Sequence, residues 1–193
     1  MAIFSERTAI LVDGGFYRLQ AKKLFGKKDP EERADELFSY CMRHLNKGSK
    51  EEASLYRIFY YDCPPSTKVV YNPVTQRAIN LEQSDQYRWM TSFIERLVTK
   101  RKVALRRGEE LATAGEYVLR PGVLKDLCAG KRSIESLTDR DVRLNITQKG
   151  VDMRIGLDIA SLVERDLVTQ IILISGLRVK MCVWLGVSRG LDL

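Results

Sequence analysis

Three aspartates stand out in this sequence because each lies beside or within an apolar segment. Asp13 ends the apolar run 8–12 and precedes two glycines, while Asp152 and Asp158 lie in a later apolar segment. Converging carboxylates, with only one histidine in the chain, suit hard, oxygen-preferring ions such as Mg²⁺ or Mn²⁺. Such ions can activate water and stabilise the attacking and leaving oxygens of a phosphodiester.

Two interpretations of Asp13 remain open from its local sequence. Residues 8–12 are short, apolar and β-branched, which predicts a buried parallel strand. Active sites of open parallel sheets lie at the carboxyl ends of strands, near the point where strand order reverses, and Asp13 is at such an end. However, Asp-Gly is also ordinary turn chemistry.

The segment 151–164 predicts a helix with one apolar stripe, made of Val151, Ile155, Ile159 and Leu162. Asp158 comes seven residues after Val151 and falls on that stripe, where a carboxylate is costly unless it is paired or bound to a cation. Asp152 lies in the first turn, where the helix N-terminus stabilises negative charge. Ordinary helices also favour an acid there.

The remaining pattern alternates strands and helices, which predicts an α/β fold with a parallel sheet covered on both faces. Prolines at 64–65 and 73 indicate a loop, and 109–142 reads as an insertion containing a short strand at 117–119 and a turn at 121–122. The other expected helices are 16–25, 29–47 and 81–100, and the other expected strands are 55–61, 102–105, 142–147 and 170–174.

Composition limits the class of protein. A chain of 193 residues with 45% hydrophobic content fits one domain. The net charge of +7 favours an anionic partner such as nucleic acid, although a solvated basic surface is the alternative. No apolar run is long enough to span a bilayer and residues 1–7 do not form a signal peptide, so we expect a cytoplasmic protein with no membrane partner.

Other reactive side chains offer little. The four cysteines are scattered, which predicts reduced thiols rather than a zinc cluster or disulfides. His44 lies in an expected helix and reads as a packing or surface residue.

Arg106 and Arg107 follow the third strand on the side of Asp13 and could contact phosphate. Tyr60 and Tyr61 could stack on unpaired bases, although at least one should be core.

Four segments together resemble the NYN-domain proteins of the LabA-like group, within the PIN-like nuclease superfamily. They span nearly the whole chain in the expected order: Ile10-Leu11-Val12-Asp13-Gly14-Gly15-Phe16, Arg57-Ile58-Phe59-Tyr60-Tyr61-Asp62, Gln148-Lys149-Gly150-Val151-Asp152 with Asp158 downstream, and Ile171-Ile172-Leu173-Ile174-Ser175-Gly176.

The resemblance implies a PIN-like Rossmannoid sheet over residues 1–176 and Mg²⁺- or Mn²⁺-dependent, endoribonuclease-like cleavage of RNA. It assigns metal-binding and catalytic roles to Asp13, Asp152 and Asp158, with Asp62 as a possible neighbour of the site. Contacts with single-stranded RNA are expected from Arg106, Arg107, Lys149 and Ser175.

The tail at 177–193 departs from the family pattern. The family continues after Ser-Gly with Asp-Ser-Asp-Phe, then a helix and a strand, whereas Leu177 and Arg178 stand here and no acid follows before Asp192. Our hypothesis for this tail is a frameshift or truncation after Gly176, and a natural divergent terminus is the alternative. Loss of the last helix and strand would uncover a sheet edge and apolar surface, lowering stability and favouring aggregation or a homo-oligomer such as a dimer.

Two functions therefore stay open from the sequence. One is an active metal-dependent ribonuclease that tolerates the altered terminus. The other is a non-catalytic RNA-binding or regulatory protein whose acidic site is incomplete. An ordinary nucleotide-binding Rossmann domain is disfavoured, because Asp13-Gly14-Gly15 lacks the Gly-x-Gly-x-x-Gly spacing.

Overall fold

The computed structural model describes residues 7–46, 54–108, 117–145, 150–176 and 183–186. Its helices are α1 (Gly14–Phe25), α2 (Pro30–Asn46), α3 (Asp85–Val98), α4 (Pro121–Cys128) and α5 (Val151–Glu164), with 3₁₀ turns η1 (Leu81–Gln83), η2 (Ile134–Ser136) and η3 (Asp139–Asp141). Its strands are β1 (Arg7–Asp13), β2 (Ser54–Asp62), β3 (Val69–Asn72), β4 (Arg77–Asn80), β5 (Val103–Arg107), β6 (Tyr117–Leu119), β7 (Val142–Leu144), β8 (Gln170–Ile174) and β9 (Val183–Gly186).

The central sheet has five strands in the order β5-β2-β1-β8-β9. The first four are parallel to one another, which confirms the expected α/β class and is consistent with a Rossmann-like fold. The chain adds β2 and β5 on one side of β1 and then returns to place β8 on the other. Strand order therefore reverses between β1 and β8, the position where open α/β sheets bind ligands.

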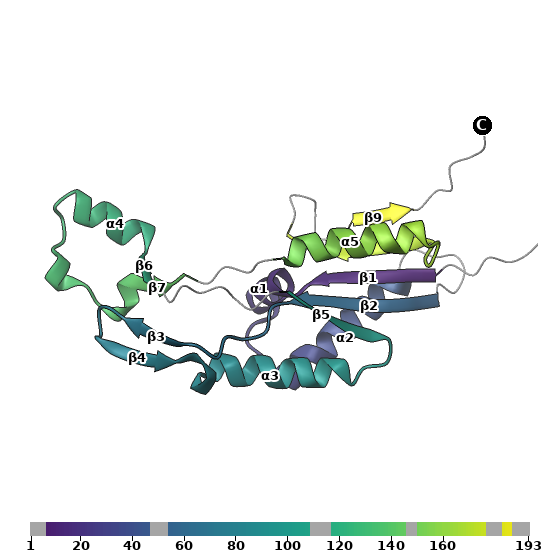
Figure 1. Ribbon diagram of the computed structural model, residues 1–193, viewed down its shortest axis with the longest axis horizontal. Helices are drawn as coiled ribbons and strands as arrows, with labels where there is room; N and C mark the ends of the chain where they lie inside the picture. The colour runs from purple at the N-terminus through teal and green to yellow at the C-terminus, as the bar shows by residue number, and fades with distance from the viewer. Residues whose placement is uncertain (1–6, 47–53, 109–116, 146–149, 177–182, 187–193) are drawn as a thin grey trace, which may run out of the picture.

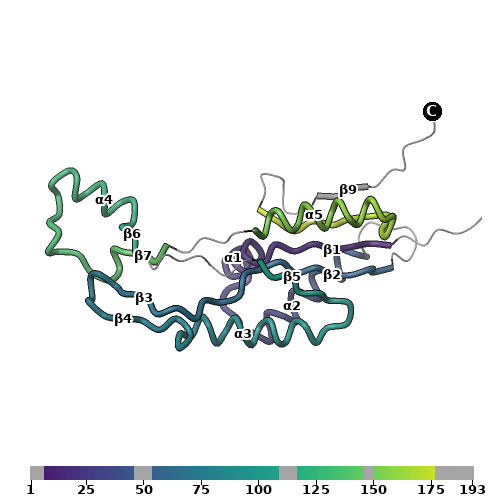
Figure 2. The backbone as a smooth tube through the Cα atoms, viewed as in Figure 1, coloured from purple at the N-terminus to yellow at the C-terminus, as the bar shows by residue number. Residues whose placement is uncertain are grey.

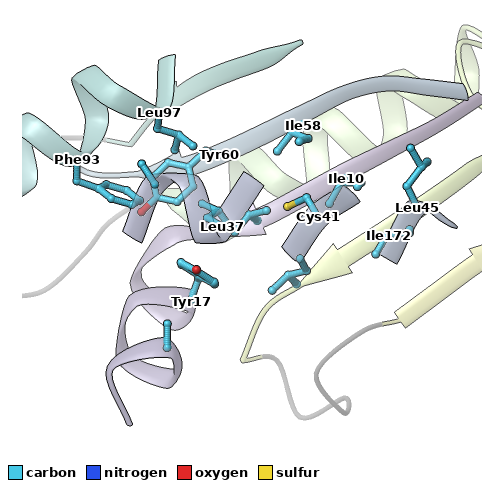
Figure 3. Close-up of a cluster of buried hydrophobic side chains, with 14 of the residues drawn as sticks. Ile10, Tyr17, Leu37, Cys41, Leu45, Ile58, Tyr60, Phe93, Leu97 and Ile172 are labelled. Atoms are coloured by element: carbon cyan, nitrogen blue, oxygen red, sulfur yellow. The ribbon is translucent and has the colours of Figure 1, made fainter. Parts of the chain in front are cut away.

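Helices cover both faces of this sheet, as expected (Figure 1). Alternate residues of β1 point to opposite faces. Ile10 and Val12 join the core under α1, α2 and α3, shown in close-up in Figure 3. Ala9 and Leu11 instead join the core under α5. Burial on both faces explains why the strand reads as a continuous apolar run rather than an alternating one.

Helix capping fixes two elements at the carboxyl edge of the sheet. The Asp13 side chain caps α1, which therefore starts directly at the end of β1. The Ser84 side chain accepts a hydrogen bond from the backbone N–H of Tyr87 and caps α3. The expected helix over 81–100 consequently begins at Asp85, preceded by the 3₁₀ turn η1.

Residues 64–80 and 117–145 contain structure that the sequence pattern did not predict. The expected loop after β2 holds the antiparallel hairpin β3–β4. Tyr117–Leu119 is a strand, as expected, but the predicted turn at Pro121-Gly122 is wrong: these residues begin α4, because proline fits the first helical position. The Asn72 side chain donates a hydrogen bond to Asp139 at 2.5 Å, and the two small sheets lie together in Figure 2.

The C-terminal region corrects one expectation. Strand β9 pairs antiparallel with β8, so the β8 edge of the sheet is covered rather than open. The departures from the family pattern at Leu177 and Arg178 lie outside the described residues, together with the rest of 177–182 and 187–193. Some apolar surface is exposed nevertheless, since Met153 and Leu157 of α5 are 67% and 62% exposed. Among the described helices, none is long and apolar enough to cross a membrane.

Candidate functional site

Asp13 and Asp152 lie at the carboxyl edge of the sheet. Asp13 is the last residue of β1, where strand order reverses, and its Oδ1 accepts a hydrogen bond from the Phe16 backbone N–H at 3.0 Å. Asp152 is the second residue of α5 and is exposed. The end of a central strand and the start of a crossover helix thus position two carboxylates that are 139 residues apart in sequence.

The two carboxylates interact electrostatically. Burial raises the pKa of Asp13 above its ordinary value, and the negative charge of Asp152 raises it further, while the N–H of Phe16 opposes both effects. Two negative charges at the same edge of the sheet favour a cation, because a bound cation offsets their repulsion. The pair therefore has the charge and ligand chemistry that a hard divalent ion requires.

Asp158 lies elsewhere and has protein partners. Its Oδ2 accepts a hydrogen bond from the Tyr61 hydroxyl at 2.8 Å and one from Arg106 Nε at 2.9 Å. The Arg106 guanidinium also lies over the Phe59 ring, 5.0 Å from its centroid. The carboxylate on the apolar stripe, which is 25% exposed, is thus explained by an ion pair within the protein.

No three histidine, cysteine, aspartate or glutamate side chains in the described ranges form a metal-binding group. Asp13 and Asp152 remain as a pair. Mg²⁺ is often bound by one or two carboxylates together with waters and substrate phosphates. The residues present therefore fit a metal that is shared between the protein and a phosphodiester.

Asp62 lies beneath the first residue of α1. It is 1% exposed, forms an ion pair with Arg18 and accepts a hydrogen bond from the Tyr60 hydroxyl at 2.8 Å. A Cβ added at Gly14 would come within 2.4 Å of Asp62 Oδ2 and of the Tyr60 ring. Glycine at this position therefore lets α1 approach β2 closely, which fixes the backbone next to Asp13.

The sequence pattern did not point to Arg18. It lies one turn into the helix that follows Asp13, and its Nη1 donates a hydrogen bond to the Tyr60 hydroxyl at 2.9 Å. The only hint in the sequence was a basic residue one helical turn after Asp13, the candidate metal ligand. Its partner Asp62 could not be identified without the strand pairing, because the two residues are 44 positions apart.

The remaining expected site residues are only partly brought together. Ser175 is 6% exposed at the end of β8, and a Cβ on the neighbouring Gly176 would meet Phe16 Cδ2 at 2.7 Å. Arg107 is exposed at the end of β5. Lys149 lies outside the described residues.

Tyr60, Tyr61 and His44 pack against neighbouring aromatic rings. Tyr60 and Tyr61 are both fully buried, so the idea that one of them stacks on a base is wrong. His44 packs edge-on against Tyr40, with ring centroids 4.5 Å apart, which confirms a packing role. Cys41, Cys63 and Cys128 form no disulfide.

Fold and site together define a Rossmann-like α/β protein with an acidic pair at the point of strand reversal. Comparison of the chain with protein-family models, with curated proteins and with solved structures finds no match.

Proposed function

We propose that the protein is a cytoplasmic, metal-dependent ribonuclease of the PIN-like NYN type, which cleaves single-stranded RNA with Mg²⁺ or Mn²⁺. The observation that carries this proposal is the placement of two carboxylates at one edge of the sheet: Asp13 ends β1, where strand order reverses, and Asp152 lies in the first turn of α5. The four sequence segments that resemble the NYN domain add support, since they supply both aspartates.

The proposed chemistry divides between a metal ion and the chain. A bound Mg²⁺ or Mn²⁺ would supply activation of water and stabilisation of charge on the phosphodiester. Asp13 and Asp152 would hold it, and the Phe16 backbone N–H, which donates to Asp13 Oδ1, orients the Asp13 carboxylate. Arg107, exposed at the same edge, would bind a neighbouring phosphate through its guanidinium.

A cleavage assay tests this proposal directly. Wild-type protein should cleave single-stranded RNA when Mn²⁺ is added and stop when it is chelated. Asp13→Asn and Asp152→Asn should each lower the rate at least a hundredfold, since a carboxylate ligand is lost. Glu164→Gln is the matched control, because it removes an exposed carboxylate from the other end of α5. Equal rates in all four proteins would refute the assignment.

A second function is favoured by one observation. In the described part of the chain the acidic group is a pair, and Asp158 is engaged by Tyr61 and Arg106. An incomplete site of this kind fits a non-catalytic RNA-binding protein. That alternative predicts RNA binding that weakens steeply with salt and no metal-dependent turnover in the wild-type protein.

A further inference from the structure

A pocket of about 370 Å³ lies between α3 and the edge strand β5. Its volume falls in the range of about 300–1,000 Å³ that is usual for small-molecule sites. Ile94 of α3 and Leu105 of β5 contribute apolar surface to its lining. The pocket is thus concave and partly apolar. Among its lining residues, the proposed cleavage chemistry uses Arg107 alone.

The pocket lining includes a cationic, an anionic and an aromatic polar side chain that the fold does not use. Arg107 lies at the carboxyl end of β5, Tyr87 in the first turn of α3 and Glu95 in its last turn. Within the described residues, none of these three side chains makes a hydrogen bond or an ion pair. Glu95 follows Tyr87 by eight residues, about 12 Å along the helix. The pocket therefore offers a cation near one end and an anion near the other.

We propose that this pocket binds a guanine nucleotide of the RNA substrate. Arg107 binds its phosphate and Tyr87 contacts the sugar or base, while Glu95 accepts hydrogen bonds from the Watson–Crick edge. Guanine fits a carboxylate best because its N1–H and N2–H₂ donors are adjacent, whereas adenine, cytosine and uracil each lack such a pair. Single-stranded RNA is commonly recognised in this way, through base edges and aromatic contacts.

The pocket adjoins the acidic site through Asp62. Asp62 is part of the pocket lining, and the Gly14 position lies directly above its carboxylate, next to Asp13. An RNA strand that passes over the carboxyl edge could therefore place one nucleotide in the pocket and a nearby phosphate at Asp13 and Asp152. This inference rests on the proposed action on RNA and adds a base preference to it.

Equilibrium binding in the presence of EDTA tests the pocket separately from cleavage. The full chain is titrated with guanosine, adenosine, cytidine and uridine 5′-monophosphates. We expect GMP to bind about tenfold or more tightly than the others, the discrimination typical of one bidentate contact to a base. Asp13→Asn should bind GMP unchanged even if it cleaves nothing, so failure of the ribonuclease proposal and failure of the pocket give different results.

Two variants test which side chain binds the base of the nucleotide and which binds its phosphate. Glu95→Gln should lose the GMP preference, and Arg107→Met should weaken GMP binding about tenfold while leaving guanosine binding unchanged. The controls are Glu82→Gln and Arg101→Met, exposed residues outside the pocket lining. Equal affinity for all four nucleotides, or a GMP preference that survives Glu95→Gln, would overturn the proposal.

Discussion

Arg106 of β5 and Asp158 of α5 form an ion pair across one face of the sheet, with 2.9 Å between Nε and Oδ2. Tyr61, the register partner of Arg106 on β2, donates its hydroxyl to the same carboxylate oxygen. This arrangement joins α5 to two strands and occupies a carboxylate that the sequence suggested as a metal ligand.

Asp158→Ala should therefore lower stability without abolishing metal-dependent cleavage per folded molecule. We expect the free energy of unfolding to fall by about 1–2 kcal/mol, because the Tyr61 hydroxyl loses its acceptor. The value is modest since Arg106 is 44% exposed. Urea unfolding measures the change, with Glu164→Ala on the same helix as the control. Loss of cleavage with unchanged stability would mean that Asp158 acts in the metal site.

Asp13→Asn should stabilise the metal-free protein at pH 7. The folded-state pKa of Asp13 is raised above the ordinary 3.8, so the folded protein holds this proton more tightly than the unfolded chain. The contribution of the Asp13 carboxyl to the free energy of unfolding of the wild type is therefore lost as pH rises from about 4 through the folded pKa. Denaturant unfolding from pH 3 to 7 should show the advantage of the variant growing with pH. A constant difference would contradict the shift.

Divalent ions should make the wild type more stable than Asp13→Asn. Mn²⁺ or Mg²⁺ bound at Asp13 and Asp152 stabilises the folded state by mass action, by about 2.7 kcal/mol at a hundred times the dissociation constant. The melting temperature of the wild type should rise with ion concentration. Asp13→Asn combined with Asp152→Asn should not respond, whereas Glu164→Gln should behave as the wild type. Equal responses of all three would place ion binding elsewhere.

Gly14→Ala should destabilise the fold, because the new Cβ would clash with Asp62 and Tyr60 at 2.4 Å. Overpacking of this kind costs about 1–3 kcal/mol. Gly156→Ala is the matched control: nothing lies within 4 Å of its Cβ position, and alanine in the middle of α5 should stabilise the helix by about 0.5–1 kcal/mol. Thermal unfolding of the two variants should move in opposite directions.

Arg18→Met should be strongly destabilising, because it leaves the Asp62 carboxylate, only 1% exposed, without its ion-pair partner. Removing one partner of a buried pair costs about 3–5 kcal/mol. Lys22→Met changes an exposed cation on the same helix and should alter stability by less than about 0.5 kcal/mol. Chemical denaturation compares them, and similar losses in both would argue against a structural role for Arg18.

The sequence by itself predicted the sheet, because its strands are buried on both faces and its helices carry one apolar stripe. The run ending in Asp13 and the helix Val151–Glu164 appear in the structure where the pattern placed them. The sequence also indicated that the Asp158 carboxylate, on the apolar stripe of this helix, needed an ion-pair partner or a bound cation. The hairpin β3–β4 escaped prediction, since its strands are only four residues long and carry little periodic signal.

Only the tertiary structure decided which aspartates come together. Asp152 and Asp158 are near each other in sequence, yet one interacts with Asp13 and the other pairs with Arg106 and Tyr61. The strand order β5-β2-β1-β8 produces this division, because it sets which strand ends and side chains lie beneath each turn of α5. Sequence periodicity shows which side of a helix is buried, but not which charged groups lie opposite it.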